Sequence, residues 1–134
     1  RRSHTGILIF VNSALVVQDS KKQNTVEFST FRAEMLTMRT AQDLTVALRI
    51  KLKMFGVPID CSADFFCDNE SVVKNTSIPT SVLAKKHNAV NYHIICESAV
   101  AGTLHVAKIP TKENKSDALT KIQQPHLQRN YLLR

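Results

Sequence analysis

Residues 29–55, STFRAEMLTMRTAQDLTVALRIKLKMF, repeat apolar side chains every three or four positions, which is the spacing of one helical face. Ser29 or Thr30 is suited to cap the start of this helix, and Gly56, two residues before Pro58, is suited to end it. The apolar face would consist of Phe31, Met35, Met38, Ala41, Leu44, Leu48, Leu52 and Phe55. Because a helix this long buries its face only against another layer, the segments on either side decide the fold class.

The segments around this helix have the patterns of short strands and further helices. Apolar runs at residues 6–11 and 14–17 flank a polar pair at residues 12–13, which indicates a hairpin, and residues 18–24 indicate the end of a strand and a loop. Strands are also predicted at residues 63–67 and 103–109, and helices at residues 71–75, 81–101 and 116–122, with Gly102 ending the second of these. This order predicts an α/β fold with a mixed sheet flanked by helices.

Composition and charge restrict the class of protein. Of 134 residues, 43% are apolar and 22% charged, which favours one globular domain over a disordered chain. No apolar run reaches the roughly 18 residues of a membrane span, so no membrane partner is expected. The net charge of +7 is spread along the chain and suits a polyanionic partner such as nucleic acid.

The cysteines and the N-terminal residues bear on location. Cys61, Cys67 and Cys96 are odd in number and have no CxxC spacing, which favours reduced thiols over disulfides or structural zinc. The first residues, RRSH, lack the order of a signal peptide. We therefore expect an intracellular protein, cytoplasmic or nuclear, and a chain cut from a longer one.

Three carboxylates stand where an α/β protein can form a site. Glu34 lies in the first turns of the long helix, Asp68 directly follows the apolar segment 63–67, and Asp117 lies at the start of the last helix. Carboxylate oxygens suit hard cations such as Mg²⁺, and two such ions can promote phosphodiester hydrolysis. Each residue also has a simpler interpretation, as a first-turn acid, a strand-end or capping residue, and a capping partner respectively. The residues alone leave both interpretations open.

Five segments, in this order and spacing, resemble the ribonuclease H domain of copia-type retrotransposon Pol polyproteins. They are RRSHTGILIFVN at 1–12, DSKKQNTVEFSTFRAE at 19–34, FCDNESVVKN at 66–75, KKHNAVNYH at 85–93 and NKSDALTK at 114–121. The resemblance covers residues 1–122 and leaves residues 123–134 as a polar C-terminal tail. It implies a ribonuclease H-like fold, hydrolysis of the RNA strand of an RNA–DNA hybrid with two Mg²⁺ ions, and a polyprotein partner that includes reverse transcriptase.

The resemblance also implies roles for particular residues. Glu34, Asp68 and Asp117 match the catalytic, metal-holding carboxylates of the family. The family's first catalytic Asp lies on a central strand that precedes the segment matched by residues 1–12. We therefore expect the first, central strand to be missing from this fragment and the fragment alone to be inactive.

Other polar residues are candidates for contacts with the hybrid. Lys85, Lys86 and His87 would follow its phosphates, because hybrids are gripped mostly through the backbone and groove shape. A solvated helix face is the simpler alternative for these three. Asn69 would either contact a ribose or cap the following helix.

Two other functions compete with the hydrolase. A catalytically dead, nucleic-acid-binding remnant would keep the basic surface around a broken site, and the absence of an upstream Asp on an apolar strand would favour it. An integrase core shares the fold but needs acidic residues in a different order and spacing. The integrase interpretation therefore ranks last.

Overall fold

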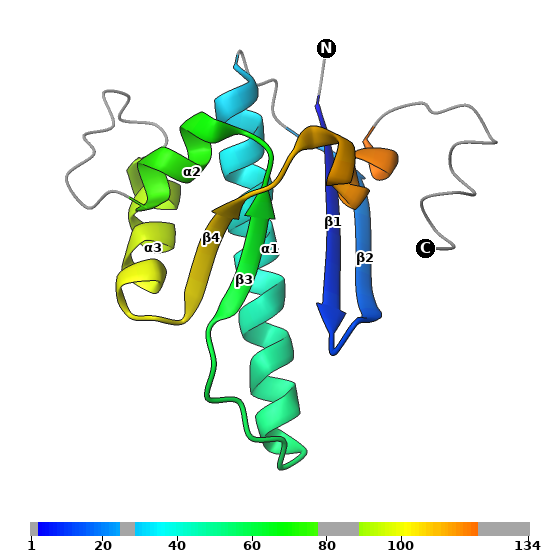
Figure 1. Ribbon diagram of the computed structural model, residues 1–134, viewed down its shortest axis with the longest axis vertical. Helices are drawn as coiled ribbons and strands as arrows, with labels where there is room; N and C mark the ends of the chain where they lie inside the picture. Colours follow the sequence, from blue (N-terminus) through cyan, green and yellow to red (C-terminus); the bar gives the residue numbers. More distant parts are fainter. Residues whose placement is uncertain (1–2, 25–28, 78–88, 121–134) are drawn as a thin grey trace.

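The computed structural model describes residues 3–24, 29–77 and 89–120 (Figure 1). Their elements follow the order predicted from the sequence: β1 (His4–Val11), β2 (Ala14–Lys22), α1 (Thr30–Met54), β3 (Ala63–Cys67), α2 (Glu70–Ser77), α3 (Ala89–Val100), β4 (Leu104–Lys108) and the 3-10 helices η2 (Thr111–Glu113) and η3 (Lys115–Leu119). These strands and helices confirm the mixed α/β class.

Among the described residues, no helix is both long enough and apolar enough to cross a membrane.

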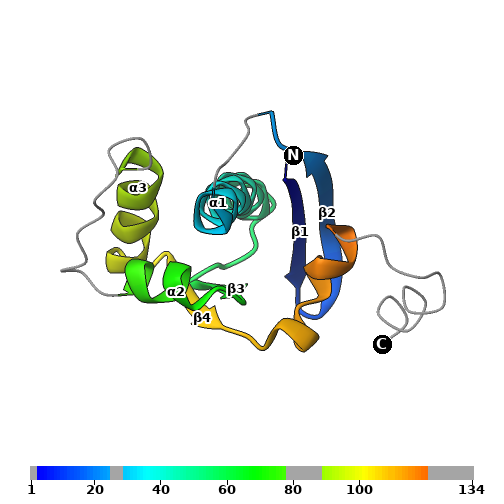
Figure 2. The same cartoon turned by 90° about the horizontal axis from the view of Figure 1, so that it is seen from above.

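The strands form two small sheets. β1 and β2 pair antiparallel, whereas β3 and β4 pair in parallel. The sequence predicted one mixed sheet without its central strand. The described strands instead form one antiparallel pair and one parallel pair. Seen from above, α1 lies between the β1–β2 hairpin and the layer of α2 and α3 (Figure 2).

The hairpin turn is confirmed, but its second strand is longer than predicted. Asn12 and Ser13 have φ values of 47° and 70°, the left-handed pair that a tight two-residue hairpin turn requires. β2 continues through Lys22, opposite His4, although residues 18–24 were predicted to be a strand end and a loop. Most side chains of β2 are exposed, so its sequence lacks the apolar alternation that marks a half-buried strand.

The long helix begins and ends as predicted but is only partly covered. The Ser29 hydroxyl accepts a hydrogen bond from the Arg32 amide at 3.3 Å, and Gly56 follows the helix with φ at 79°. Met35 and Met38 are buried, as expected for the apolar face, whereas Phe55 is 83% exposed. Figure 1 gives the reason, because the C-terminal part of α1 extends beyond the ends of both sheets.

An apolar core fixes the relation between α1 and β3. Met35, Val72 and Ile95 are fully buried, and Tyr92, Leu104 and Val106 are among the residues that surround them. Phe65 and Cys67 of β3 pack against this cluster. The core therefore holds the end of β3 close to the first turns of α1.

The remaining predictions differ in length from what is observed. The helix predicted at residues 71–75 spans Glu70–Ser77, and the one predicted at 81–101 is described only for Ala89–Val100, ahead of Gly102 with φ at 70°. The last predicted helix, residues 116–122, is the short 3-10 helix η3 within the described part of the chain. The predicted tail, residues 123–134, lies outside the described residues.

Candidate functional site

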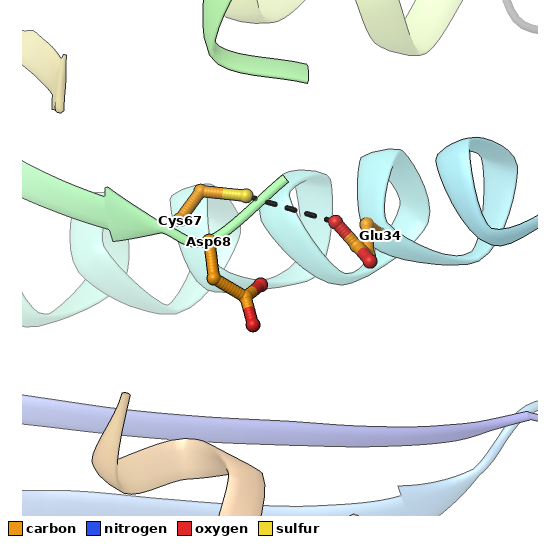
Figure 3. Close-up of side chains that lie close together, drawn as sticks. All are labelled: Glu34, Cys67 and Asp68. Carbon is orange, nitrogen blue, oxygen red and sulfur yellow. Dashed lines mark hydrogen bonds between the residues drawn. The ribbon is translucent and has the colours of Figure 1, made fainter. Parts of the chain in front are cut away.

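Two carboxylates and a thiol from distant parts of the chain meet where α1 and β3 approach each other (Figure 3). The possible ligand atoms of Glu34, Cys67 and Asp68 all lie within 4.8 Å of one another. Glu34 precedes the buried Met35 on α1, and Cys67 is the last residue of β3. The core contacts of the neighbouring residues thus bring the three side chains into one cluster.

The cluster concentrates negative charge. Burial raises the pKa of Glu34 above its ordinary value, and the charges of Asp68 and Asp117 raise it further. Hydrogen bonds from the side chains of Asn69 and Cys67 act in the opposite direction. Because both neighbouring charges are negative, a bound cation would relieve the repulsion that Glu34 experiences.

Cys67 belongs to the cluster, although the sequence predicted only that its thiol is reduced. Its sulfur lies 3.8 Å from Glu34 Oε2 and points toward that oxygen (Figure 3). Burial raises the pKa of Cys67 to about 11, and the charges of Glu34 and Asp68 add to the effect. The thiol therefore stays protonated at neutral pH and donates to Glu34.

The one sequence feature that could have indicated a role of Cys67 in the site is its position directly before Asp68 at the end of a strand. All three cysteines are free, as predicted.

Asp117 acts on the cluster from the 3-10 helix η3. This helix lies directly against the hairpin, because a Cβ on Gly6 would come within 2.7 Å of the Ser116 carbonyl oxygen. The Ser20 hydroxyl also donates to the Leu119 carbonyl at 3.0 Å. The structure thus brings Glu34 and Asp68 within ligand distance of each other, and it places Asp117 where its charge raises the pKa of Glu34.

Asn69 has the capping role that was one of its two predicted roles. Its side-chain oxygen accepts hydrogen bonds from the backbone amides of Ser71 at 2.9 Å and Val72 at 3.4 Å, at the start of α2. Its side chain also hydrogen-bonds to Glu34. Asn69 therefore connects the first turn of α2 to the carboxylate cluster. A contact with a ribose stays a prediction.

Gln23 supports the same region, and the sequence did not predict this. Its side chain is 5% exposed, and Nε2 donates to the Ala33 carbonyl at 3.0 Å and to the Thr5 hydroxyl at 3.2 Å. These bonds tie β1 to the first turns of α1, next to Glu34. Residues 18–24 were predicted to be a strand end and a loop, and local pattern carries no signal that a polar residue there is buried.

The predicted phosphate-binding residues Lys85, Lys86 and His87 lie outside the described residues. Their proposed contact with nucleic acid therefore stays a prediction.

The chain is similar to segments of retrovirus-related Pol polyproteins from plant transposons. It is 30% identical over 122 residues to the retrovirus-related Pol polyprotein from transposon TNT 1-94 of Nicotiana tabacum. These 122 residues are 91% of this chain and 9% of that protein. It is 25% identical over 119 residues to the corresponding polyproteins from transposons RE2 and RE1 of Arabidopsis thaliana, over 89% of this chain and 8% of each relative. The chain thus spans less than a tenth of the length of these relatives. No family model and no solved structure matches it.

Proposed function

We propose that this chain is part of the ribonuclease H domain of a retrotransposon Pol polyprotein, and that this domain hydrolyses the RNA strand of RNA–DNA hybrids. Glu34, Asp68 and Asp117 are its proposed catalytic residues. The observation that carries the proposal is the approach of Glu34 and Asp68, whose ligand atoms lie within 4.8 Å of each other. The similarity to Pol polyproteins over nine-tenths of the chain supports the polyprotein context.

The chemistry of the cluster fits Mg²⁺. Carboxylate oxygens are the ligands that this hard cation prefers, and Glu34 is surrounded by negative charge that a cation would neutralise. Glu34, Asp68 and Asp117 would hold the ions, with the Cys67 thiol beside them. When bound, the ions would supply Lewis-acid assistance to the hydrolysis of the phosphodiester.

The other residues of the site orient the carboxylates and attract the substrate. Asn69 and Cys67 hydrogen-bond to Glu34 and so restrict its side chain. The net charge of +7 favours a polyanion, and Lys85 and Lys86 are proposed to contact phosphates of the hybrid. Such contacts carry no base specificity, as a nuclease that acts on any hybrid requires.

Ion binding tests the site independently of turnover. We expect Mn²⁺, followed by electron paramagnetic resonance, to bind the parent chain and to bind much more weakly to Glu34→Gln and Asp68→Asn. Glu113→Gln, which changes an exposed carboxylate on η2, is the matched control and should bind like the parent. Equal binding by all three variants would contradict the proposed site.

Hybrid cleavage then tests the reaction. A labelled RNA–DNA hybrid should be cut in its RNA strand, with Mg²⁺ present, by the polyprotein segment that carries this chain, and Glu34→Gln should abolish the cleavage. The proposal would be overturned if both the segment and the chain alone bound the hybrid in a salt-sensitive way without cleaving it. That result would favour a nucleic-acid-binding remnant.

A further inference from the structure

The second half of α1 carries an exposed apolar stripe. Val46, Ile50 and Met54 recur every four residues and so lie along one side of the helix, where they are 47%, 55% and 81% exposed. Phe55 and Val57 continue the apolar surface beyond the helix end. Five of the eleven exposed large hydrophobic side chains among the described residues therefore fall within residues 46–57, and such a concentration marks an interaction site more often than scattered exposure does.

The stripe borders a groove at the opposite end of α1 from Glu34. A cavity of about 290 Å³ lies between this part of the helix and the two parallel strands, with Val46, Ile50, Phe65 and Leu104 contributing apolar lining. Ile50 follows Glu34 by sixteen residues, which corresponds to roughly 24 Å along a helix. The groove is therefore separate from the carboxylate cluster.

The charge around the groove has one sign. Arg49 and Lys53 line it together with the apolar residues, and Lys51 is exposed in the same turns. Residues 44–59 contain no Asp or Glu. Arg49 donates from Nη2 to the Cys61 carbonyl at 2.8 Å, which helps to hold its guanidinium beside the groove. A matching partner would offer apolar side chains flanked by carboxylates.

Charge argues against this chain as its own partner. A second copy seated on the same surface would bring Arg49, Lys51 and Lys53 against themselves, and like charges in contact are unfavourable. The two longer segments outside the described residues, 78–88 and 121–134, contain basic residues and no Asp or Glu. Neither this surface in a second copy nor these two segments therefore offer the complementary negative charge.

We propose that Val46, Ile50 and Met54, with the adjoining groove, form a docking surface for an acidic amphipathic helix from outside these 134 residues. The apolar residues of that helix would pack on the stripe, and its Asp or Glu side chains would pair with Arg49 and Lys53. An amphipathic helix in an apolar groove is a recurrent mode of recognition, with anchors spaced as they are on this stripe. The proposal does not depend on the reaction proposed above.

The test uses two labelled synthetic helical peptides that share one leucine stripe. One carries Glu beside the leucines and the other carries Lys, and fluorescence anisotropy measures the binding of each to the chain. We expect the Glu peptide to bind at least about tenfold more tightly than the Lys peptide. Ile50→Ser and Met54→Ser should each weaken the binding of the Glu peptide about tenfold, because each removes an apolar contact. Val90→Ser, which changes a 69% exposed side chain on α3, is the matched control and should leave binding unchanged.

Charge reversal distinguishes docking from nonspecific adhesion. The double variant Arg49→Glu with Lys53→Glu should prefer the Lys peptide, and circular dichroism should show an unchanged fold. Equal binding of both peptides to the parent chain would overturn the proposal. Two other outcomes would overturn it as well: displacement of the Glu peptide by an RNA–DNA hybrid would assign the surface to nucleic acid, and self-association that Ile50→Ser abolishes would assign it to a second copy.

Discussion

Replacement of Gly6 by alanine tests how η3 is held against the hairpin. In open space this change would stabilise a strand by about 0.5–1 kcal/mol, because alanine restricts the unfolded chain and suits a strand better. The new Cβ, however, would lie 2.7 Å from the Ser116 carbonyl oxygen and 2.8 Å from Thr120 Cγ2. A backbone oxygen cannot rotate away, so η3 has to move. Overpacking of this kind costs about 1–3 kcal/mol, which leaves a net loss of up to about 2.5 kcal/mol in the free energy of unfolding.

Two measurements check this expectation. Urea denaturation gives the loss of stability, and an NMR titration gives the pKa of Glu34. This pKa should fall slightly as Asp117 moves away with η3, because burial and the charge of Asp68, which raise it more, remain. Gly102→Ala is the control: its φ of 70° strains alanine by about 1–2 kcal/mol, but no atom lies within 4 Å of the added Cβ. It should destabilise the protein and leave the Glu34 titration unchanged. A Gly6→Ala protein more stable than the parent would refute the close packing of η3 on β1.

Three further changes test the environment of individual side chains. Because the folded-state pKa of Glu34 is raised above 4.5, its ionisation opposes folding, and the stability of the protein should fall as pH rises through that pKa. In urea denaturation, Glu34→Gln should therefore be as stable as the parent near pH 3 and more stable than the parent at pH 7. A difference in stability that does not change with pH would contradict this. Gln23→Ala should lower the free energy of unfolding by about 1–3 kcal/mol, since it removes buried hydrogen bonds, and a neutral result in the same assay would count against the bonds to α1. Iodoacetamide at pH 8 should modify the exposed Cys61 at least about tenfold faster than Cys67, because Cys67 is more buried and its pKa is near 11. Mass spectrometry measures both rates, and unfolding in urea should abolish the difference between them.

The elements with a local pattern were predictable, and those without one were not. α1 and β3 appear at the expected places because their apolar spacing, the capping Ser29 and the terminal Gly56 are all written in neighbouring residues. The end of β2 was not predictable, because its pairing with β1 is set by the hairpin register and its side chains are mostly exposed. Phe55 fits the helical period yet is exposed, since the period cannot reveal where the covering layers end.

The residues of the candidate site likewise divide into those that a local sequence pattern predicts and those that it does not. Asp68 and Asp117 stand out in sequence because each follows a strand or opens a short helix, and Glu34 because it lies near an apolar face. The inclusion of Cys67 in the cluster and the burial of Gln23 depend on contacts between segments far apart in the chain. No local pattern encodes such contacts, and only the packing of α1 on β1 and β3 reveals them.

The structure argues against two of the simpler interpretations, Glu34 as a first-turn acid and Asp68 or Asp117 as an N-cap. Glu34 is not a first-turn acid, because the first turn of α1 contains no acidic residue, and its surroundings raise its pKa where a helix N-terminus would lower it. The capping of α2 is supplied by Asn69 and that of η3 by Asn114, whose side chain accepts from the Ser116 amide, so neither Asp68 nor Asp117 is needed as an N-cap. Asp68 directly follows β3, and Asp117 accepts a hydrogen bond from the Thr120 hydroxyl at 3.4 Å at the end of η3. Both charges nevertheless repel that of Glu34 and raise its pKa. A cation that binds Glu34 and Asp68 would turn that repulsion into attraction, which is why ion binding is the property that most directly tests the proposed site.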